Sequence, residues 1–137
     1  MDALWPPQLL SSRPPLARAF VAVITPALFG AVCGLVLGVS AALYLVLTIP
    51  VAIAGGFAAG VEHTRAGDGA VRGVVGGLIF GSLIVAVHAA IGNDAKVDLP
   101  HPAILLAVVT GIGGSVLGAL GAWLRGRGSI AQRAPAG

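Results

Sequence analysis

The sequence holds few charged residues: Asp, Glu, Lys and Arg make up 9% of it, against about a quarter in an ordinary soluble domain. Charge is absent altogether from three long stretches, residues 19–61, 73–93 and 99–124. Crossing the hydrocarbon core of a bilayer takes about 20 consecutive apolar residues. The scarcity of charge therefore argues against a soluble globular domain and predicts a chain that lies in a membrane.

The first uncharged stretch is too long for one crossing. A single helix over residues 19–61 would be about 65 Å long, at about 1.5 Å per residue, whereas the hydrocarbon core is about 30 Å thick. The stretch must fold back and cross twice, so the sequence predicts an all-α bundle of four transmembrane helices, arranged as two hairpins. Continuous rather than alternating apolar runs favour helices over a β-barrel. We expect the helices at about residues 17–37, 41–61, 71–91 and 102–124.

Glycine and proline indicate where these helices start, turn and bend. Gly38–Ser40 predicts the turn between the first two spans, and Gly67–Gly69 predicts a turn before the third. Pro102 predicts the start of the fourth span, because proline is tolerated in a first helical turn. Pro26 and Pro50 fall inside spans, where each removes a backbone hydrogen bond and predicts a bend.

Little structure is expected outside the four spans. Residues 1–16 contain two proline pairs and predict an extended arm, with Trp5 at the level of the lipid headgroups; the alternative is a disordered tail. Residues 125–137 are basic and rich in glycine and alanine, which predicts a disordered tail. The apolar stretch from Ala19 exceeds the 7–15 residues of a signal peptide. We therefore expect the first span to be retained, with cleavage near Ala41 as the alternative.

Basic residues predict the orientation of the chain. Seven of the eight Lys and Arg residues, all except Lys96, flank span ends that would share one side of the membrane. The positive-inside rule then predicts that the N and C termini are both cytoplasmic, in a cell (inner or plasma) membrane. The pI near 10 is explained by this orientation, and we expect no nucleic-acid partner because the basic residues form no patch with aromatic side chains.

Several chemical signatures are missing. Cys33 is the only cysteine, so no disulfide forms within the chain. The sequence has no P-loop, no H-E-x-x-H zinc motif and no G-x-S-x-G nucleophile motif, and we expect no catalytic residue, cofactor or metal. No span carries a charged residue near its middle, so the buried carboxylate of a small proton-coupled exporter is absent. These absences predict that the protein is not an enzyme.

Glycine, in contrast, is abundant, with 21 residues, and many recur at intervals of four. Residues four apart share a helix face, and the missing side chains let helices approach closely in lipid. The segments Gly55–Gly60 and Gly76–Gly81 share a pattern and are expected to contact each other. Every span carries such a face, so some are available to a second copy or another protein, unless internal packing uses them all. The predicted helix-packing residues are Gly34, Gly38, Gly56, Gly60, Gly73, Gly77, Gly81, Gly114 and Gly118.

Four polar residues cluster where the second span is expected to leave the membrane: Glu62, His63, Arg65 and Arg72. We expect Glu62 to pair with Arg65, which lies three residues further along a helix, or with Arg72 across the loop. One interpretation is a salt-bridge cluster that fixes the hairpin. The other is a cytoplasmic gate or a docking site for a partner.

Two histidines form the second candidate group. His88 lies in the third predicted span, and an ionisable side chain at such a depth is a functional candidate. His101, at the start of the fourth span, is expected at a similar depth, with Asp98 close by. The residues predict either structural histidines with hydrogen-bond partners or a proton relay or metal site.

The sequence therefore predicts a small, non-enzymatic, multi-pass membrane protein. Its expected partners are the lipid bilayer and either itself or another membrane protein, with association through the glycine faces. The alternative is a small oligomeric channel or transporter for a proton, an ion or a small solute. Pro26, Pro50, His88 and hydroxyl side chains scattered along the spans favour this alternative.

Overall fold

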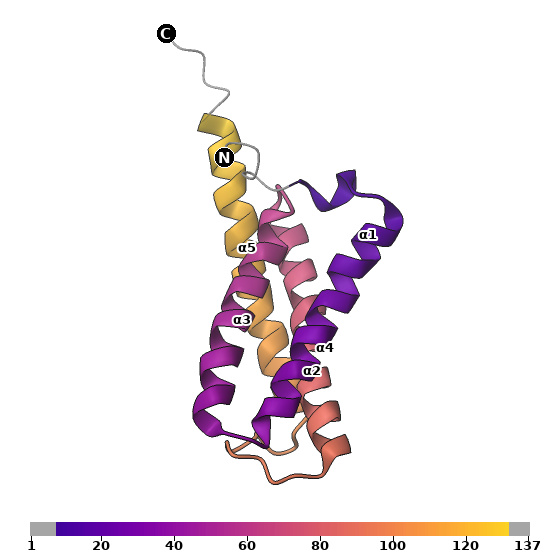
Figure 1. The fold of residues 1–137 in the computed structure, drawn as a ribbon. Helices are drawn as coiled ribbons and strands as arrows, with labels where there is room; N and C mark the ends of the chain where they lie inside the picture. Colours follow the sequence, from indigo (N-terminus) through magenta and orange to yellow (C-terminus); the bar gives the residue numbers. More distant parts are fainter. Residues whose placement is uncertain (1–7, 132–137) are drawn as a thin grey trace.

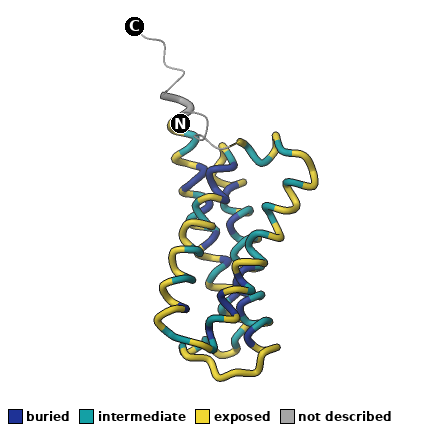
Figure 2. The backbone as a smooth tube through the Cα atoms, viewed as in Figure 1, coloured by how far each residue is buried: buried dark blue, intermediate teal, exposed yellow. Residues whose placement is uncertain are grey.

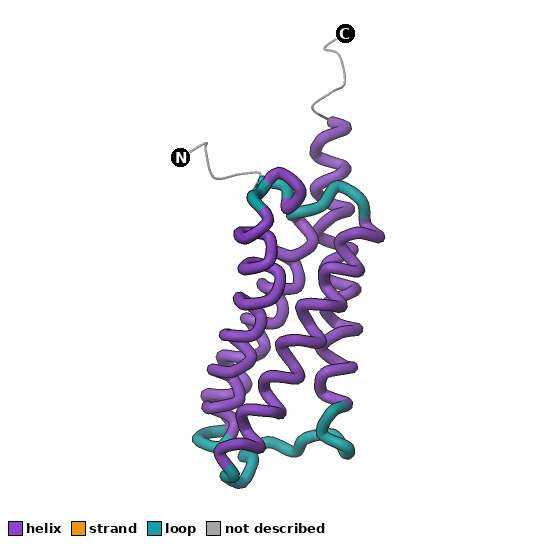
Figure 3. Tube along the Cα trace, turned by 90° about the vertical axis from the view of Figure 1, so that its right-hand side faces the viewer, coloured by secondary structure: helices purple, strands orange, loops and turns teal. Residues whose placement is uncertain are grey.

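The computed structural model describes residues 8–131, which form an all-helical bundle (Figure 1). Within them, four helical segments are long and apolar enough to cross a membrane by length and composition: Pro15–Leu37, Ala41–Val61, Ala66–Ile91 and Leu105–Gly128. The segments are joined at the two ends of the bundle (Figure 3). The fold is thus that of a multi-pass membrane protein, as the uncharged runs predict.

The first span is one rod built from three consecutive helical segments. These are α1 (Pro15–Ala19), the π-helical η2 (Phe20–Ile24) and α2 (Thr25–Leu37). The N–H of Thr25 donates to the carbonyl of Phe20, five residues earlier. The widened turn comes just before Pro26, which has no N–H to give.

The prediction of an extended arm over residues 1–16 is wrong for its described part. Leu10–Ser12 forms the 3-10 helix η1, and α1 begins at Pro15. Proline fits the first position of a helix because the N–H there needs no partner inside the helix. Trp5 lies outside the described residues.

The turn predicted at Gly38–Ser40 is confirmed. Helix α2 ends at Leu37, and α3 (Ala41–Val61) follows directly. Ser40 is the N-cap of α3, and its hydroxyl accepts a hydrogen bond from the N–H of Leu43 (3.4 Å). The cap supplies a partner for one of the N–H groups that a helix start leaves unpaired.

Helix α4 (Ala66–Ile91) begins five residues before the expected position, at residue 66 instead of 71. The turn predicted at Gly67–Gly69 is therefore wrong, because these residues form the first turn of the helix. The backbone of Gly69 lies against α5, where a Cβ would overlap the carbonyl oxygen of Gly118. At the other end, Gly92 closes the helix in the left-handed region (φ 74°), which glycine adopts without strain.

Helix α5 (Leu105–Ala131) differs from expectation at both ends. It starts after Pro102, because Pro102–Ile104 form a turn in which each carbonyl accepts from the N–H three residues later. It also continues past residue 124, so the disordered tail predicted from residue 125 is wrong as far as Ala131. There the guanidinium of Arg127 lies over the ring of Trp123, 3.9 Å from its centroid, one turn along the helix. Residues 132–137 lie outside the described part of the chain.

Helices α4 and α5 run antiparallel with their backbones close together. A Cβ on Gly73 would overlap the carbonyl oxygen of Gly114, and one on Gly77 would overlap that of Thr110. The hydroxyl of Thr110 donates to the carbonyl of Gly77 (2.7 Å), and Gly81 lies one turn further along, against Ala107. The contacts advance by about four residues on each helix, so one face of α4 follows one face of α5.

The other two spans also approach their neighbours at glycines. Gly30 and Gly34 of α2 lie against the backbones of Phe80 and Ile84 in α4. In α3, Gly60 lies against Gly118, and Gly56 lies against Leu117. The predicted contact between Gly55–Gly60 and Gly76–Gly81 is wrong, because the nearest atoms to Gly56, Gly60, Gly77 and Gly81 belong to α5, which packs against both helices.

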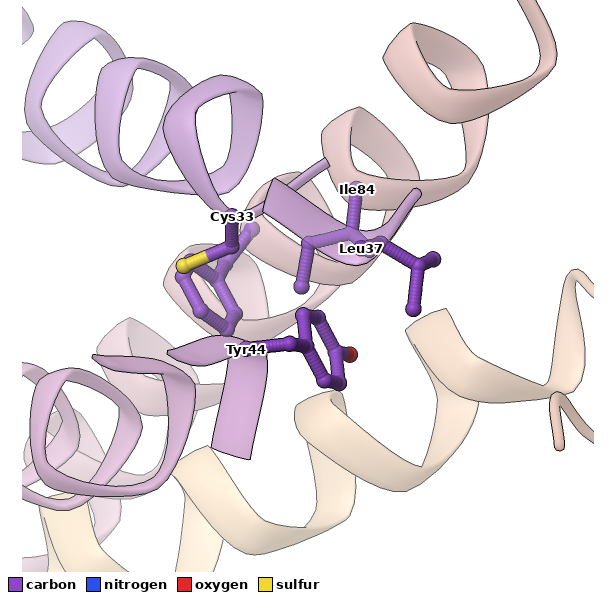
Figure 4. Close-up of a cluster of buried hydrophobic side chains, with 5 residues drawn as sticks. Cys33, Leu37, Tyr44 and Ile84 are labelled. Atoms are coloured by element: carbon purple, nitrogen blue, oxygen red, sulfur yellow. The ribbon is translucent and has the colours of Figure 1, made fainter. Parts of the chain in front are cut away.

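The largest fully buried side chains gather in the half of the bundle near the α2–α3 turn. Cys33 and Leu37 of α2, Tyr44 of α3 and Ile84 of α4 converge there (Figure 4). Outward-facing positions along the helices are exposed and mostly aliphatic (Figure 2). A surface of this kind is suited to lipid tails.

Substitutions of two adjacent glycines in α5, Gly113 and Gly114, test the close approach of α4 and α5. Gly114→Ala places a methyl group on the carbonyl of Gly73, so the helices must separate, and we expect the free energy of unfolding to fall by about 1–3 kcal/mol. Gly113→Ala is the matched control, because no atom lies within 4 Å of its added Cβ. Unfolding in detergent micelles, followed by circular dichroism, measures both. Equal stability of the two variants would contradict this packing.

Candidate functional site

Glu62 is the only buried acidic residue among those described, with 7% of its surface exposed. It is the C-cap residue of α3, at the end of the bundle where residues 10–13 lie. The carboxylate pairs with Arg13, with 3.1 Å between Oε1 and Nη2, and the Glu62 carbonyl accepts from the N–H of Leu10 (3.1 Å). Residues 10–13 are therefore fastened to the end of α3 at two points.

Arg72 lies in the second turn of α4, and its side chain is nine-tenths buried (10% exposed). Its Nη2 donates to the backbone carbonyl of Val21 (2.8 Å). In the five-residue spacing set by Phe20 and Thr25, this carbonyl would need the N–H of residue 26, which is a proline. Arg72 thus supplies the hydrogen bond that Pro26 removes.

Arg72 and Glu62 also face each other, with 4.0 Å between Nε and Oε2. The separation allows electrostatic attraction but is too long for a hydrogen bond. Among the described residues, neither Nε of Arg72 nor Oε2 of Glu62 has a hydrogen-bond partner. One donor and one acceptor are therefore left unpaired side by side, and leaving buried polar groups unpaired is costly.

Both side chains line a cavity of about 620 Å³ between the first span and α3. The two helices diverge from their shared turn, and α4 and α5 contribute to the wall between them (Figure 1). Ile49, Ile53 and Val109 are on the lining and exposed, so the cavity opens on the surface of the bundle. The remainder of the lining is mostly apolar and small: Val21, Thr25, Pro26, Phe29, Val51, Ala52, Ala54, Gly55, Gly56, Ala58, Ala59, Gly73, Gly76, Gly77, Phe80, Thr110, Gly113, Gly114 and Leu117.

The structure brings together only part of the predicted polar cluster. Glu62 pairs with Arg72 rather than with Arg65, which is exposed and precedes the first turn of α4. His63 is half-buried, and its Nε2 has no hydrogen-bond partner among the described residues. Arg125 donates from Nη1 to the carbonyl of Val61, the residue before Glu62.

The two histidines lie in different environments. His88 is buried (9% exposed) beside Gly38, and its Nδ1 has no hydrogen-bond partner in the part of the chain that the structure describes. His101 and Asp98 are both exposed. No group of three His, Cys, Asp or Glu side chains among residues 8–131 could hold a metal ion, so the metal site considered for this set is not formed.

Sequence reasoning missed Arg13 and the cavity. The pairing of Arg13 with Glu62 joins residues far apart in the chain, and no local pattern announces it. The only signal for an additional contact was Pro26 in the sequence. Proline has no N–H, so a carbonyl in the preceding helical turn needs a donor from elsewhere.

The site combines an apolar cavity with one charged end. Apolar walls bind hydrocarbon without specific contacts, and a few polar groups fix the orientation of the bound molecule. Such a site suits an amphipathic molecule, because its polar part can lie at the end of the cavity that Glu62 and Arg72 line. Comparison with protein-family models, curated proteins and solved structures finds no match to this chain.

Arg72→Met tests the role of the arginine. It leaves the Val21 carbonyl and one side of Glu62 without a partner, and we expect the free energy of unfolding to fall by about 3 kcal/mol. Arg65→Met is the control, because it removes a positive charge from an exposed position near the same end of the bundle. Its free energy of unfolding should stay within about 0.5 kcal/mol of the wild-type value. Chemical unfolding in micelles measures both variants.

A double-mutant cycle isolates the hydrogen bond to Val21. Pro26→Ala restores an N–H that can bond to this carbonyl, so Arg72→Met should cost at least about 1 kcal/mol less in the Pro26→Ala background than in the wild type. An identical cost in both backgrounds would show that Arg72 does not compensate for Pro26.

Proposed function

We propose that this chain is a non-enzymatic, multi-pass protein of the cell membrane that binds a small amphipathic molecule in the cavity between the first span and α3. The observation that carries this proposal is an apolar cavity ending on a buried Glu62–Arg72 pair with an unpaired donor and an unpaired acceptor. Its volume, about 620 Å³, lies within the range of about 300–1,000 Å³ for small-molecule sites. Of the two functions expected from the sequence, this proposal is nearer to the second, a transporter for a small solute.

The wall of the cavity supports binding from within the membrane. Its lining includes exposed residues of α3 and α5, so an apolar tail can enter from the side without passing through water. The ionic end lies beside the connection between α3 and α4, where a polar group can reach the bilayer surface. His88 is not on the lining, and the proposal gives it no part in binding.

The distribution of charge supports cytoplasmic termini. Arg13, Arg65 and Arg72 lie at or near the end of the bundle that carries both ends of the described chain. The opposite end carries Lys96 together with Asp94 and Asp98. By the positive-inside rule, the arginine-rich end faces the cytoplasm.

Association with a second copy or another membrane protein is a second candidate. One observation favours it: Ala54, Gly55 and Ala58 of α3 are exposed and small, and together with Gly113 of α5 they leave a face on which a helix can lie closely. The glycines Gly60, Gly73, Gly77, Gly81, Gly114 and Gly118 lie against neighbouring helices within the chain, so an association would use this uncovered face instead.

Cysteine labelling tests the orientation. In a Cys33→Ala background, we compare Asp94→Cys with Asp68→Cys, which places the thiol at the opposite end of α4; both aspartates are exposed. A maleimide that cannot cross the membrane, applied to intact cells, should label residue 94 and leave residue 68 unlabelled until the cells are opened. Labelling of residue 68 alone in intact cells would show that the orientation is the opposite of the one proposed.

Native mass spectrometry of the gently extracted protein tests the proposed binding. The wild type should retain one small amphipathic molecule per chain. Gly55→Leu should lose it, because the new side chain enters the cavity and meets no protein atom within 4 Å of its Cβ.

Gly67→Leu is the matched control. Gly67 is also an exposed helical glycine with open space around its Cβ, but it is not on the cavity lining, so its variant should retain the molecule. A wild type that carries no small molecule and appears as a defined oligomer, or with another protein, would favour association instead.

A further inference from the structure

We propose that the molecule bound in this cavity is a phospholipid with an anionic headgroup that bears free hydroxyl groups, such as phosphatidylglycerol. One acyl chain occupies the apolar cavity, and the phosphate and hydroxyls lie at Arg72 and Glu62. The inference rests on the proposed function and names the chemical class of its ligand.

The balance of charge at this end selects an anion. Arg13 and Arg72 face the single carboxylate of Glu62. Two guanidinium groups therefore meet one carboxylate, and one added phosphate reduces the excess of positive charge. A zwitterionic headgroup leaves this excess unchanged.

The unpaired atoms select the headgroup further. Nε of Arg72 is a donor without a partner, and a guanidinium presents its N–H groups in a planar fork that suits phosphate oxygens. Oε2 of Glu62 is an acceptor without a partner, and it needs an O–H or N–H group beside the phosphate. Both atoms are buried and lie 4.0 Å apart, so a headgroup reaches them when the two side chains move apart. A phosphate ester of glycerol then provides an oxygen for Arg72 and a hydroxyl for Glu62.

The cavity accounts for the lipid tail. Both polar side chains are on the lining of the same cavity as Phe29, Ile53 and Phe80, so headgroup and tail positions are continuous. Because Ile53 and Phe29 are exposed, a chain can pass from the surrounding lipid into the cavity while the headgroup stays at the membrane surface.

The test is a native mass spectrometry titration of the full-length protein after removal of bound lipid. The probes are phosphatidylglycerol, phosphatidylethanolamine and diacylglycerol with identical acyl chains, together with glycerol 3-phosphate, which has no tail. We expect phosphatidylglycerol to bind about tenfold more tightly than diacylglycerol, because it adds hydrogen bonds to charged groups. Glycerol 3-phosphate alone should not bind.

Variants separate the headgroup from the tail. Arg72→Gln should bring the affinities for phosphatidylglycerol and diacylglycerol to within about twofold of each other, whereas the exposed control Arg65→Gln should keep the wild-type ratio. If Arg72→Gln does not fold, Arg13→Gln provides the second variant and should reduce the same ratio. Gly55→Leu should weaken the binding of both lipids alike, because it fills the space for the tail.

Each contrary result overturns a different statement. Equal binding of phosphatidylglycerol and diacylglycerol by the wild type would refute the headgroup assignment and leave the cavity function intact. Phosphatidylethanolamine binding as tightly as phosphatidylglycerol would refute the selection for an anion. Glycerol 3-phosphate binding as tightly as the lipid would identify a site for a free anion. If no lipid binds, both this inference and the proposed function fail.

Discussion

The hydrogen bond from Arg72 to the carbonyl of Val21 joins the first span to the third. A backbone group without a partner is costly in an apolar environment. The N–H of Thr25 bonds to Phe20, and Pro26 has no N–H to continue the five-residue spacing, so the Val21 carbonyl has no helical donor. The arginine that satisfies it is itself buried beside Glu62, so the same contact brings a charged pair to the end of the cavity. The widened turn in the first span and the polar end of the site are therefore linked through the same carbonyl group.

The close approach of α4 and α5 gives this site a firm support. In lipid, helices gain little from the hydrophobic effect, so contacts between backbones and hydrogen bonds such as that from Thr110 to Gly77 carry more of the packing. The first span and α3 pack onto this pair and diverge from each other (Figure 1). A cavity remains between them because much of its wall on α4 and α5 consists of glycines, which have no side chains to fill the space.

Buried charges are expensive unless they are paired and hydrogen-bonded. Glu62 and Arg72 are paired at long range and retain one unpaired atom each, in contrast to Arg13, which approaches the carboxylate closely. A ligand that completes both sets of hydrogen bonds therefore gains affinity from groups that the protein alone leaves unsatisfied.

The sequence by itself determined that the chain has four apolar helices and where the first two turn, because the lack of charge over residues 19–61 and the Gly38–Ser40 break act locally. Other boundaries were predicted less well: Gly67–Gly69 became helical, and α5 continued past residue 124, because packing against a neighbouring helix or side chain outweighs the local preference of glycine. Only the tertiary structure decided that Arg13 and Arg72, rather than Arg65, meet Glu62. That choice depends on how helices distant in sequence lie against each other, and the spacing of residues along one chain does not contain it.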